Sequence, residues 1–324
     1  MISENKTVGN TPMIKINYIY KGKANYIYAK LEYYNITGSI KDRVAYYIVN
    51  KAKERGELKE NTAIVEATSG NTGIALAALG SYYKHPVVIF MPDWASKERI
   101  ELMKSYGADV RLISKEEGGF VKAIKEAEKL ARETNSFLSN QFSNTDNILA
   151  HYETTGEEIF KQVPEEIGGF VSGVGTGGTL MGISKRLKEE YNELITTAIE
   201  PDKMPLLSNG KVIGQHKIEG IGDDFIPKLV DKMKIDKIIL VNDEDAINMA
   251  RRISRELGIG VGISSGANFL GSVQLANNID KKVVTVFADD NKKYLSTELS
   301  NEIDSNPNYI SNEIELISYE VVST

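Results

Sequence analysis

Lys41 is the lysine whose surroundings could make it a chemical reagent. It follows a strand-like segment, residues 25–31, and a turn containing Gly38, and it precedes an apolar run from Val44 to Val49. This order predicts a strand, a turn and a helix that begins near Lys41. A helix N-terminus helps to keep an amine neutral, and a neutral amine can form an imine with a carbonyl cofactor or act as a base. Taken alone, the ordinary interpretation is favoured, in which Lys41 is one of 39 solvated basic residues.

Composition limits the other sources of chemistry. The 324 residues contain no cysteine, which excludes disulfides, thiolate nucleophiles and cysteine-ligated metals. The three histidines, His85, His151 and His216, show no metal-ligand spacing and are expected to be structural or on the surface. No metal site is predicted. The chemistry must then come from Lys, Ser, Thr, Asp or Glu, or from an organic cofactor.

Charge and hydropathy restrict the partners. The net charge of −6 argues against nucleic acid or an anionic membrane as a partner. No apolar stretch approaches the roughly 20 residues needed to span a bilayer. Residues 1–11 are polar and lack the apolar core of a signal peptide, so we expect a cytoplasmic protein that acts on a small molecule.

Strands and helices alternate along the chain. Strands are predicted over residues 63–67, 86–91, 109–114, 170–172, 194–199 and 283–287, and helices over 71–83, 96–108, 121–133, 180–191 and 244–257. This alternation predicts an α/β fold with mostly parallel sheets covered on both faces. Ligands in such sheets bind where strands end, so the turns after Ala67, after Ser172 and before Asn268 are the candidate sites. The polar segment after Ile303 is expected to pack loosely or to join an oligomer contact.

The first two turns could each bind an anion. Residues 68–73, Thr-Ser-Gly-Asn-Thr-Gly, are rich in hydroxyls at a helix start, although a helix capped by Ser69 would explain them without a ligand. Residues 173–179, Gly-Val-Gly-Thr-Gly-Gly-Thr, would let backbone amides approach a phosphate. Residues 173–178 also fit the dinucleotide pattern G-x-G-x-x-G, with Glu200 near the position of a ribose-binding acid. The third turn, Ser264-Ser265-Gly266, is expected to follow a strand, and alone it is typical of a helix cap.

Together these segments resemble one family. In the order of these motifs the chain resembles the cysteine synthase and cystathionine β-synthase family of pyridoxal-phosphate enzymes. The motifs are the lysine segment, 68–73, Asn140-Gln141-Phe142, 151–156, 173–179, Gly220-Ile221-Gly222 and Ser264-Ser265-Gly266. The resemblance runs from about Gly9 to Thr297 and removes the dinucleotide alternative. It implies two doubly wound three-layer lobes with mostly parallel sheets (fold type II), in one catalytic unit, residues 1–300. The smaller, mobile lobe would span about 42–150 and the larger one 1–41 plus 151–300, with a tail at 301–324. It also implies a homodimer.

The resemblance assigns roles position by position. Lys41 would hold pyridoxal 5'-phosphate as an imine and move the α-proton, and Ser264 would face the pyridine nitrogen. Asn71 would bond to the phenolic oxygen of the cofactor. The phosphate would lie on Gly175, Thr176, Gly177, Gly178 and Thr179. The substrate carboxylate would be bound by Thr68, Ser69, Thr72 and Gln141. A neutral serine at the ring nitrogen would make the cofactor ring a weaker electron sink, which favours expulsion of a β-substituent. A nucleophile then adds to the resulting aminoacrylate, and the overall reaction is β-replacement.

Asp223 is the informative departure from the family. Cysteine synthases usually carry Ala-Gly at the positions of Asp223 and Asp224, and cystathionine β-synthases carry Tyr-Asp. A carboxylate at this place could take a proton from water and would repel hydrosulfide, unless Asp223 is only a solvated turn residue. We therefore expect L-cysteine and water to give L-serine and hydrogen sulfide, as in the cysteine hydroxyl-lyase branch. A second departure, Asn291-Lys292-Lys293 in place of Gly-Glu-Arg, has no mechanistic explanation from the sequence.

Two alternatives to that reaction remain. One, within the same family, is synthesis of cysteine from O-acetylserine and sulfide, or formation of cystathionine or lanthionine with a thiol. The other is a binding protein without catalytic activity, which the intact Lys41 and phosphate loop oppose.

Overall fold

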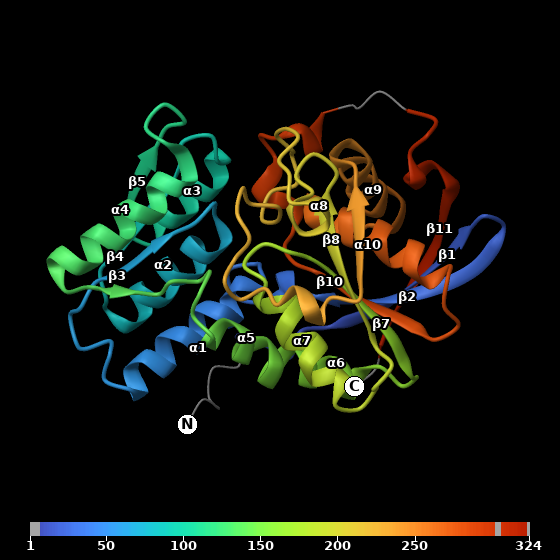
Figure 1. Cartoon of the computed structure of the whole chain (residues 1–324), viewed down its shortest axis with the longest axis horizontal. Coiled ribbons are helices and arrows are strands. Elements are labelled where there is room, and N and C mark those ends of the chain that lie inside the picture. Colours follow the sequence, from blue (N-terminus) through green and yellow to red (C-terminus); the bar gives the residue numbers. More distant parts are fainter. Residues whose placement is uncertain (1–6, 302–305, 323–324) are drawn as a thin grey trace.

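A seven-stranded sheet forms the larger of two lobes (Figure 1). The computed structural model describes residues 7–301 and 306–322. The strand order is β11-β1-β2-β10-β7-β8-β9, in which β1 is antiparallel to both of its neighbours and the remaining pairs are parallel. The strands are β1 (Met13–Tyr20), β2 (Lys23–Leu31), β7 (Ile167–Gly173), β8 (Ile195–Pro201), β9 (Lys237–Val241), β10 (Lys282–Phe287) and β11 (Ile314–Val321).

Helices cover both faces of this sheet. Helices α9 (Asp243–Leu257) and α10 (Ile263–Ala276) pack on one face, and α6 (Glu157–Gln162) and α7 (Gly178–Lys188) pack on the other. Strand β7 is buried along nearly its whole length, as expected of a central strand covered on both sides. The start of α9 is fixed by Asn242, whose side chain accepts from the backbone N–H groups of Glu244 and Asp245.

The smaller lobe contains a four-stranded parallel sheet in the order β5-β4-β3-β6. Its strands are β3 (Ile64–Ala67), β4 (Val87–Pro92), β5 (Asp109–Ile113) and β6 (Phe137–Leu138). Helices α1 (Lys41–Glu54), α2 (Asn71–Tyr83) and α3 (Lys97–Ser105) pack on one face, and α4 (Gly119–Thr134) packs on the other. Short helices α5 (Asp146–Ala150) and α8 (Leu206–Asn209) and a π-helical turn (His151–Gly156) lie in the connections. Within the described residues, no helix has the length and hydropathy to cross a bilayer.

The predicted α/β class with two parallel-rich sheets is confirmed. Two local predictions are wrong, and so is the alternative in which Ser69 caps α2. The turn before Ser264 follows no strand, because residues 258–262 form an irregular link between α9 and α10. Ser69 does not cap α2, whose N-cap residue is Gly70 with a φ of +157°. The tail does not pack loosely, because β11 completes the large sheet and pairs with β1; residues 302–305 and 323–324 of the tail lie outside the described part. The mobility of the smaller lobe stays a prediction.

Candidate active site

Lys41 is the first residue of α1, as predicted, and it lines a cleft between the lobes with about 810 Å³ of empty space. The turn before it is fixed from the large sheet, because the backbone N–H of Ile40 donates to the carbonyl of Ala288 at 2.8 Å. Burial lowers the pKa of the Lys41 amine, and the carboxylates of Asp289 and Asp223 act in the opposite direction. A lowered pKa makes the neutral form, which nucleophilic chemistry requires, easier to reach.

Lys293 supports the same turn. It is 3% exposed, and its Nζ donates to the carbonyl of Gly38 at 2.8 Å. Opposite it, Asp42 accepts from the hydroxyl of Thr37 at 2.7 Å and from the backbone of Thr37 and Ser39. The Asn-Lys-Lys departure thus places an amine against the backbone that precedes Lys41, which the sequence did not predict.

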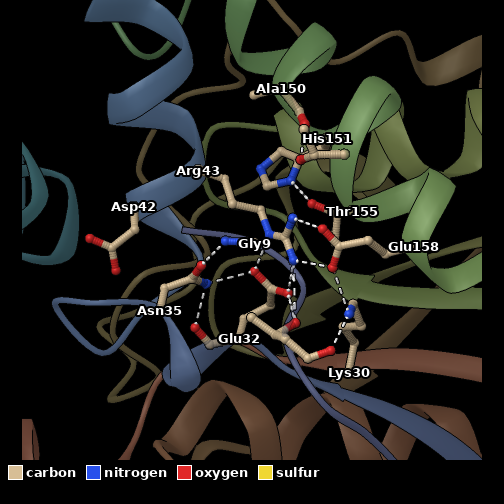
Figure 2. A network of polar contacts seen from close by, with 12 residues as sticks. Gly9, Lys30, Glu32, Asn35, Asp42, Arg43, Ala150, His151, Thr155 and Glu158 are labelled. Carbon is tan, nitrogen blue, oxygen red and sulfur yellow. Dashed lines mark hydrogen bonds and ion pairs between the residues drawn. The ribbon is translucent and has the colours of Figure 1, made fainter. Parts of the chain in front are cut away.

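A buried network of four charged residues anchors α1 two residues after Lys41 (Figure 2). The Arg43 guanidinium forms two bonds with Glu32, at 2.6 and 2.8 Å, and two with Glu158, at 2.6 and 2.7 Å. Lys30 adds an ion pair with Glu158 at 2.8 Å and donates to the Thr11 carbonyl at 2.5 Å. Burial alone would raise the pKa of Glu158, but Arg43 and Lys30 hold it at about 2. Two cations and two carboxylates thus balance one another, with only Glu158 of the four partly exposed.

His151 connects this region to the phosphate loop. It is fully buried, with Nδ1 2.9 Å from the Thr155 hydroxyl and Nε2 3.1 Å from the Thr179 hydroxyl. Burial, and then the nearby positive charges of Lys41 and Arg43, lower the pKa of His151 well below its usual value. A neutral imidazole therefore orients Thr179, which confirms the structural role expected of this histidine.

The turn after β3 brings polar side chains to the cleft. The hydroxyl of Thr72 donates to Gln141 Oε1 at 2.5 Å, and Gln141 Nε2 donates to the Ala67 carbonyl at 2.9 Å. The Thr68 hydroxyl accepts from the backbone N–H of Gly70 at 3.0 Å. Asn71 Nδ2 donates to Asp289 at 2.8 Å, while its buried Oδ1 has no partner among the described residues.

The loop after β7 lies across the same cleft, at the N-terminus of α7. Asn147 Nδ2 donates to the Thr176 hydroxyl at 2.9 Å. A Cβ on Gly175 would come within 2.3 Å of the Gly220 carbonyl, and Gly177 has a φ of +88°, so this loop requires glycine at both positions. Glu200, the acid of the dinucleotide alternative, instead accepts from the backbone of Leu207 and Ser208 at the start of α8.

Asp223 lines the cleft and is not a solvated turn residue, whereas Asp224 is exposed. Burial and the neighbouring Asp224 charge raise the pKa of Asp223 to about 6, and Lys41 lowers it. Asp223 makes no hydrogen bond or ion pair with the described residues. A half-buried carboxylate with a pKa near neutrality, on the same cleft as the amine, fits a general base.

The predicted site residues meet at this one cleft. Its lining includes Lys41, Thr68, Ser69, Asn71, Thr72, Gln141, Gly175, Thr176, Gly177, Thr179, Asp223 and Ser264. Gly178 is the first residue of α7 and is not one of the lining residues. Ser264 lies in the first turn of α10. Arg99 and Glu219 also line the cleft and form an ion pair, but no sequence pattern predicted a role for them or for Asp289. Of these three residues, only Asp289 could have been found from the sequence, because it follows the end of a predicted strand, where ligands bind.

The match to a family model identifies the kind of enzyme to which this cleft belongs. Residues 5–289 match the family described as pyridoxal-phosphate dependent enzyme. This chain belongs to that family. It is a pyridoxal-phosphate-dependent β-replacing enzyme of the cysteine synthase type, and pyridoxal phosphate is its cofactor.

Similar proteins fall into two groups. The chain is 48% identical to a hydrogen sulfide-producing enzyme from Fusobacterium nucleatum, with a TM-score of 0.93 and coverage of 97% of this chain and 96% of the other. It is 41% identical to a probable cysteine synthase of Bacillus subtilis (strain 168) over 90% of this chain and 95% of that protein. A cysteine synthase structure from Entamoeba histolytica is 38% identical, with a TM-score of 0.87 and coverage of 96% and 95%.

The residues at the cleft fit the cofactor. The glycine and threonine loop at the start of α7 offers N–H and hydroxyl donors to a phosphate. The Lys41 amine, with its pKa lowered, lines the same cleft. The unpartnered Oδ1 of Asn71 marks a polar position beside it.

Proposed function

We propose that this enzyme converts L-cysteine and water into L-serine and hydrogen sulfide. The observation that carries the proposal is Asp223, a carboxyl with a pKa of about 6 on the cleft that Lys41 lines. When bound, the cofactor supplies the electron sink that lets the α-proton leave and the β-substituent depart. The Cβ–S bond breaks, a Cβ–O bond forms with oxygen from water, and the sulfur leaves as hydrogen sulfide.

In this proposal the residues of the cleft have the following roles. Lys41 holds the cofactor and moves the proton at Cα. Asp223 takes a proton from water as its oxygen joins Cβ, and its negative charge disfavours entry of hydrosulfide. Asn71 and Ser264 hold the cofactor ring, at its phenolic oxygen and its nitrogen. The phosphate is bound by Gly175, Thr176, Gly177, Gly178 and Thr179, and the substrate carboxylate by Thr68, Ser69, Thr72 and Gln141.

The direct test is the set of products from L-cysteine as sole substrate. We expect sulfide and serine in equal amounts, and Asp223→Asn should lower serine formation on the order of 10²-fold or more. Pyruvate and ammonia in place of serine, or full activity of the variant, would contradict the proposal.

Cysteine synthesis from O-acetylserine and sulfide is the second candidate, because the chain is 41% identical to a probable cysteine synthase. Faster consumption of O-acetylserine with sulfide than release of sulfide from cysteine would favour it. We also propose a homodimer, on the family resemblance. Sedimentation of the holoenzyme at twice the mass of the 35.9 kDa chain would support it, and a monomer would contradict it.

A further inference from the structure

Asp223 lies in the long irregular segment between α8 and β9, so its position depends on contacts with other segments. One side is tied to the larger lobe, because the Gly222 N–H donates to the Val174 carbonyl at 3.0 Å. Within the segment, His216 Nε2 lies 2.7 Å from the Gly222 carbonyl. The loop then continues past Asp223 to Phe225. That ring packs against Phe142 at 5.1 Å and Phe120 at 6.5 Å between centroids.

Another contact with the smaller lobe is the ion pair between Arg99 and Glu219, four residues before Asp223. Arg99 lies on α3 and its side chain is 3% exposed, whereas Glu219 is 30% exposed. The Arg99 side chain crosses Gly70 so closely that a Cβ there would lie 2.1 Å from Arg99 Cδ. Its guanidinium lies 4.5 Å from the centre of the Tyr294 ring.

Within the described residues, two carboxylates lie within ion-pair distance of Arg99, and Glu219 is the nearer of them. The other nearby carboxylate is Asp289, at 3.8 Å, which already accepts from Asn71 and from the Tyr294 hydroxyl, each at 2.8 Å. A buried cation without a close partner is strongly destabilising. Arg99 therefore favours the loop position in which Glu219 reaches it.

We propose that the Arg99–Glu219 ion pair positions Asp223 to take a proton from water, so that the smaller lobe controls the second half of the reaction. The inference rests on the function proposed for Asp223. Neither residue of the pair exchanges a proton in this scheme, because both act through the loop backbone. Loss of the pair should therefore spare sulfide release and slow water addition, because a displacement of about 1 Å can cost on the order of 10² in rate.

The experiment compares Glu219→Gln with Glu98→Gln in the holoenzyme. Glu98 also lies on α3 and binds across the lobes, accepting from the Ser296 N–H at 2.8 Å and hydroxyl at 2.7 Å, but it does not contact the Asp223 loop. With L-cysteine as substrate, Glu219→Gln should lower the ratio of serine to pyruvate by about 10-fold or more, while sulfide release stays within about 2-fold. Glu98→Gln should keep the wild-type ratio. Equal ratios in all three proteins, or an equal fall in both variants, would overturn the proposal.

A second measurement does not depend on the substrate. Amide hydrogen exchange of residues 221–230 should be faster in Arg99→Gln than in wild type and unchanged in Glu98→Gln. Adding Glu219→Gln to Arg99→Gln should produce no further increase, because the two residues act as a pair. If wild type forms no serine, the proposed function fails, while the exchange data still decide whether the pair holds the loop. Unchanged exchange in Arg99→Gln would overturn the positioning role.

Discussion

Two groups of buried charge lie on either side of the start of α1, and they differ in how completely they are paired. Around Arg43, each carboxylate of Glu32 and Glu158 meets a cation, and none of these residues lines the cleft. Around Lys41, within the described residues, the amine has no ion-pair partner and Asp289 Oδ1 has no hydrogen bond. A paired charge is held in its ionised form and fixes the backbone, whereas burial pushes an unpaired group toward its neutral form and leaves it available for chemistry.

The largest effect should follow from removing the amine at the cleft. Lys41→Ala should reduce turnover of L-cysteine on the order of 10⁴-fold, because both cofactor attachment and proton transfer are lost. The visible absorbance of cofactor bound to lysine, which borohydride abolishes, should be absent, while the thermal unfolding midpoint of the apoprotein stays close to wild type. Residual turnover above a tenth of wild type would contradict the role of Lys41.

The paired group should respond in the opposite way, through stability. Arg43→Met leaves two carboxylates buried without their shared cation, and should lower the free energy of unfolding by about 3–5 kcal/mol. Arg111→Met, which removes an ion pair with Asp109 between two exposed side chains, is the control and should leave the unfolding midpoint almost unchanged. Urea unfolding measures both. Equal midpoints for the two variants would show that burial of the Arg43 network does not matter.

A smaller and more specific effect is the pH dependence of serine formation. Asp223 must be ionised to accept a proton, and burial raises its pKa to about 6. The rate should therefore fall as the pH drops below about 6, with a slope that Asp223→Asn removes. The measurement is serine formed from L-cysteine between pH 5 and 8, with sulfide release followed in parallel. An unchanged acid limb in the variant would assign the titration to another group.

The sequence could predict the parts of the site that lie in local patterns, but not the contacts between distant segments. The Lys41 helix start and the loops at 68–73 and 173–179 follow from local alternation of strand and helix, and the structure brings them to one cleft. Arg99 and Glu219 are 120 positions apart, and neither stands in a recognisable local pattern. The tail strand β11 was missed because its apolar residues alternate weakly, with Ile314 and Leu316 buried and the rest of the strand largely exposed.

Glu66 is an intermediate case, because it is buried and hydrogen-bonded but has no cationic partner among the described residues. Its carboxyl accepts from the Ser139 hydroxyl at 2.6 Å and from the N–H groups of Gln141 and Ala67 at 3.0 and 2.8 Å. Burial raises its pKa to about 7 despite these bonds. The folded state therefore binds a proton that the unfolded state releases near the ordinary value of about 4.5, so this contribution to stability is present below pH 4.5 and is lost as the pH rises through 7.

Glu66→Gln has no titrating carboxyl at this position, so it does not lose this contribution as the pH rises. Its free energy of unfolding, relative to that of wild type, should therefore increase by about 3 kcal/mol between pH 4 and pH 8. Urea unfolding of both proteins across this range measures the difference. Glu158 has the reverse sign, because its cations hold its pKa at about 2 and its contribution is lost as the pH falls below 4.5. If the free energies of unfolding of wild type and Glu66→Gln change with pH in parallel, the carboxylate of Glu66 is not destabilised by burial. Three hydrogen bonds would then stabilise a buried carboxylate as well as a cation does.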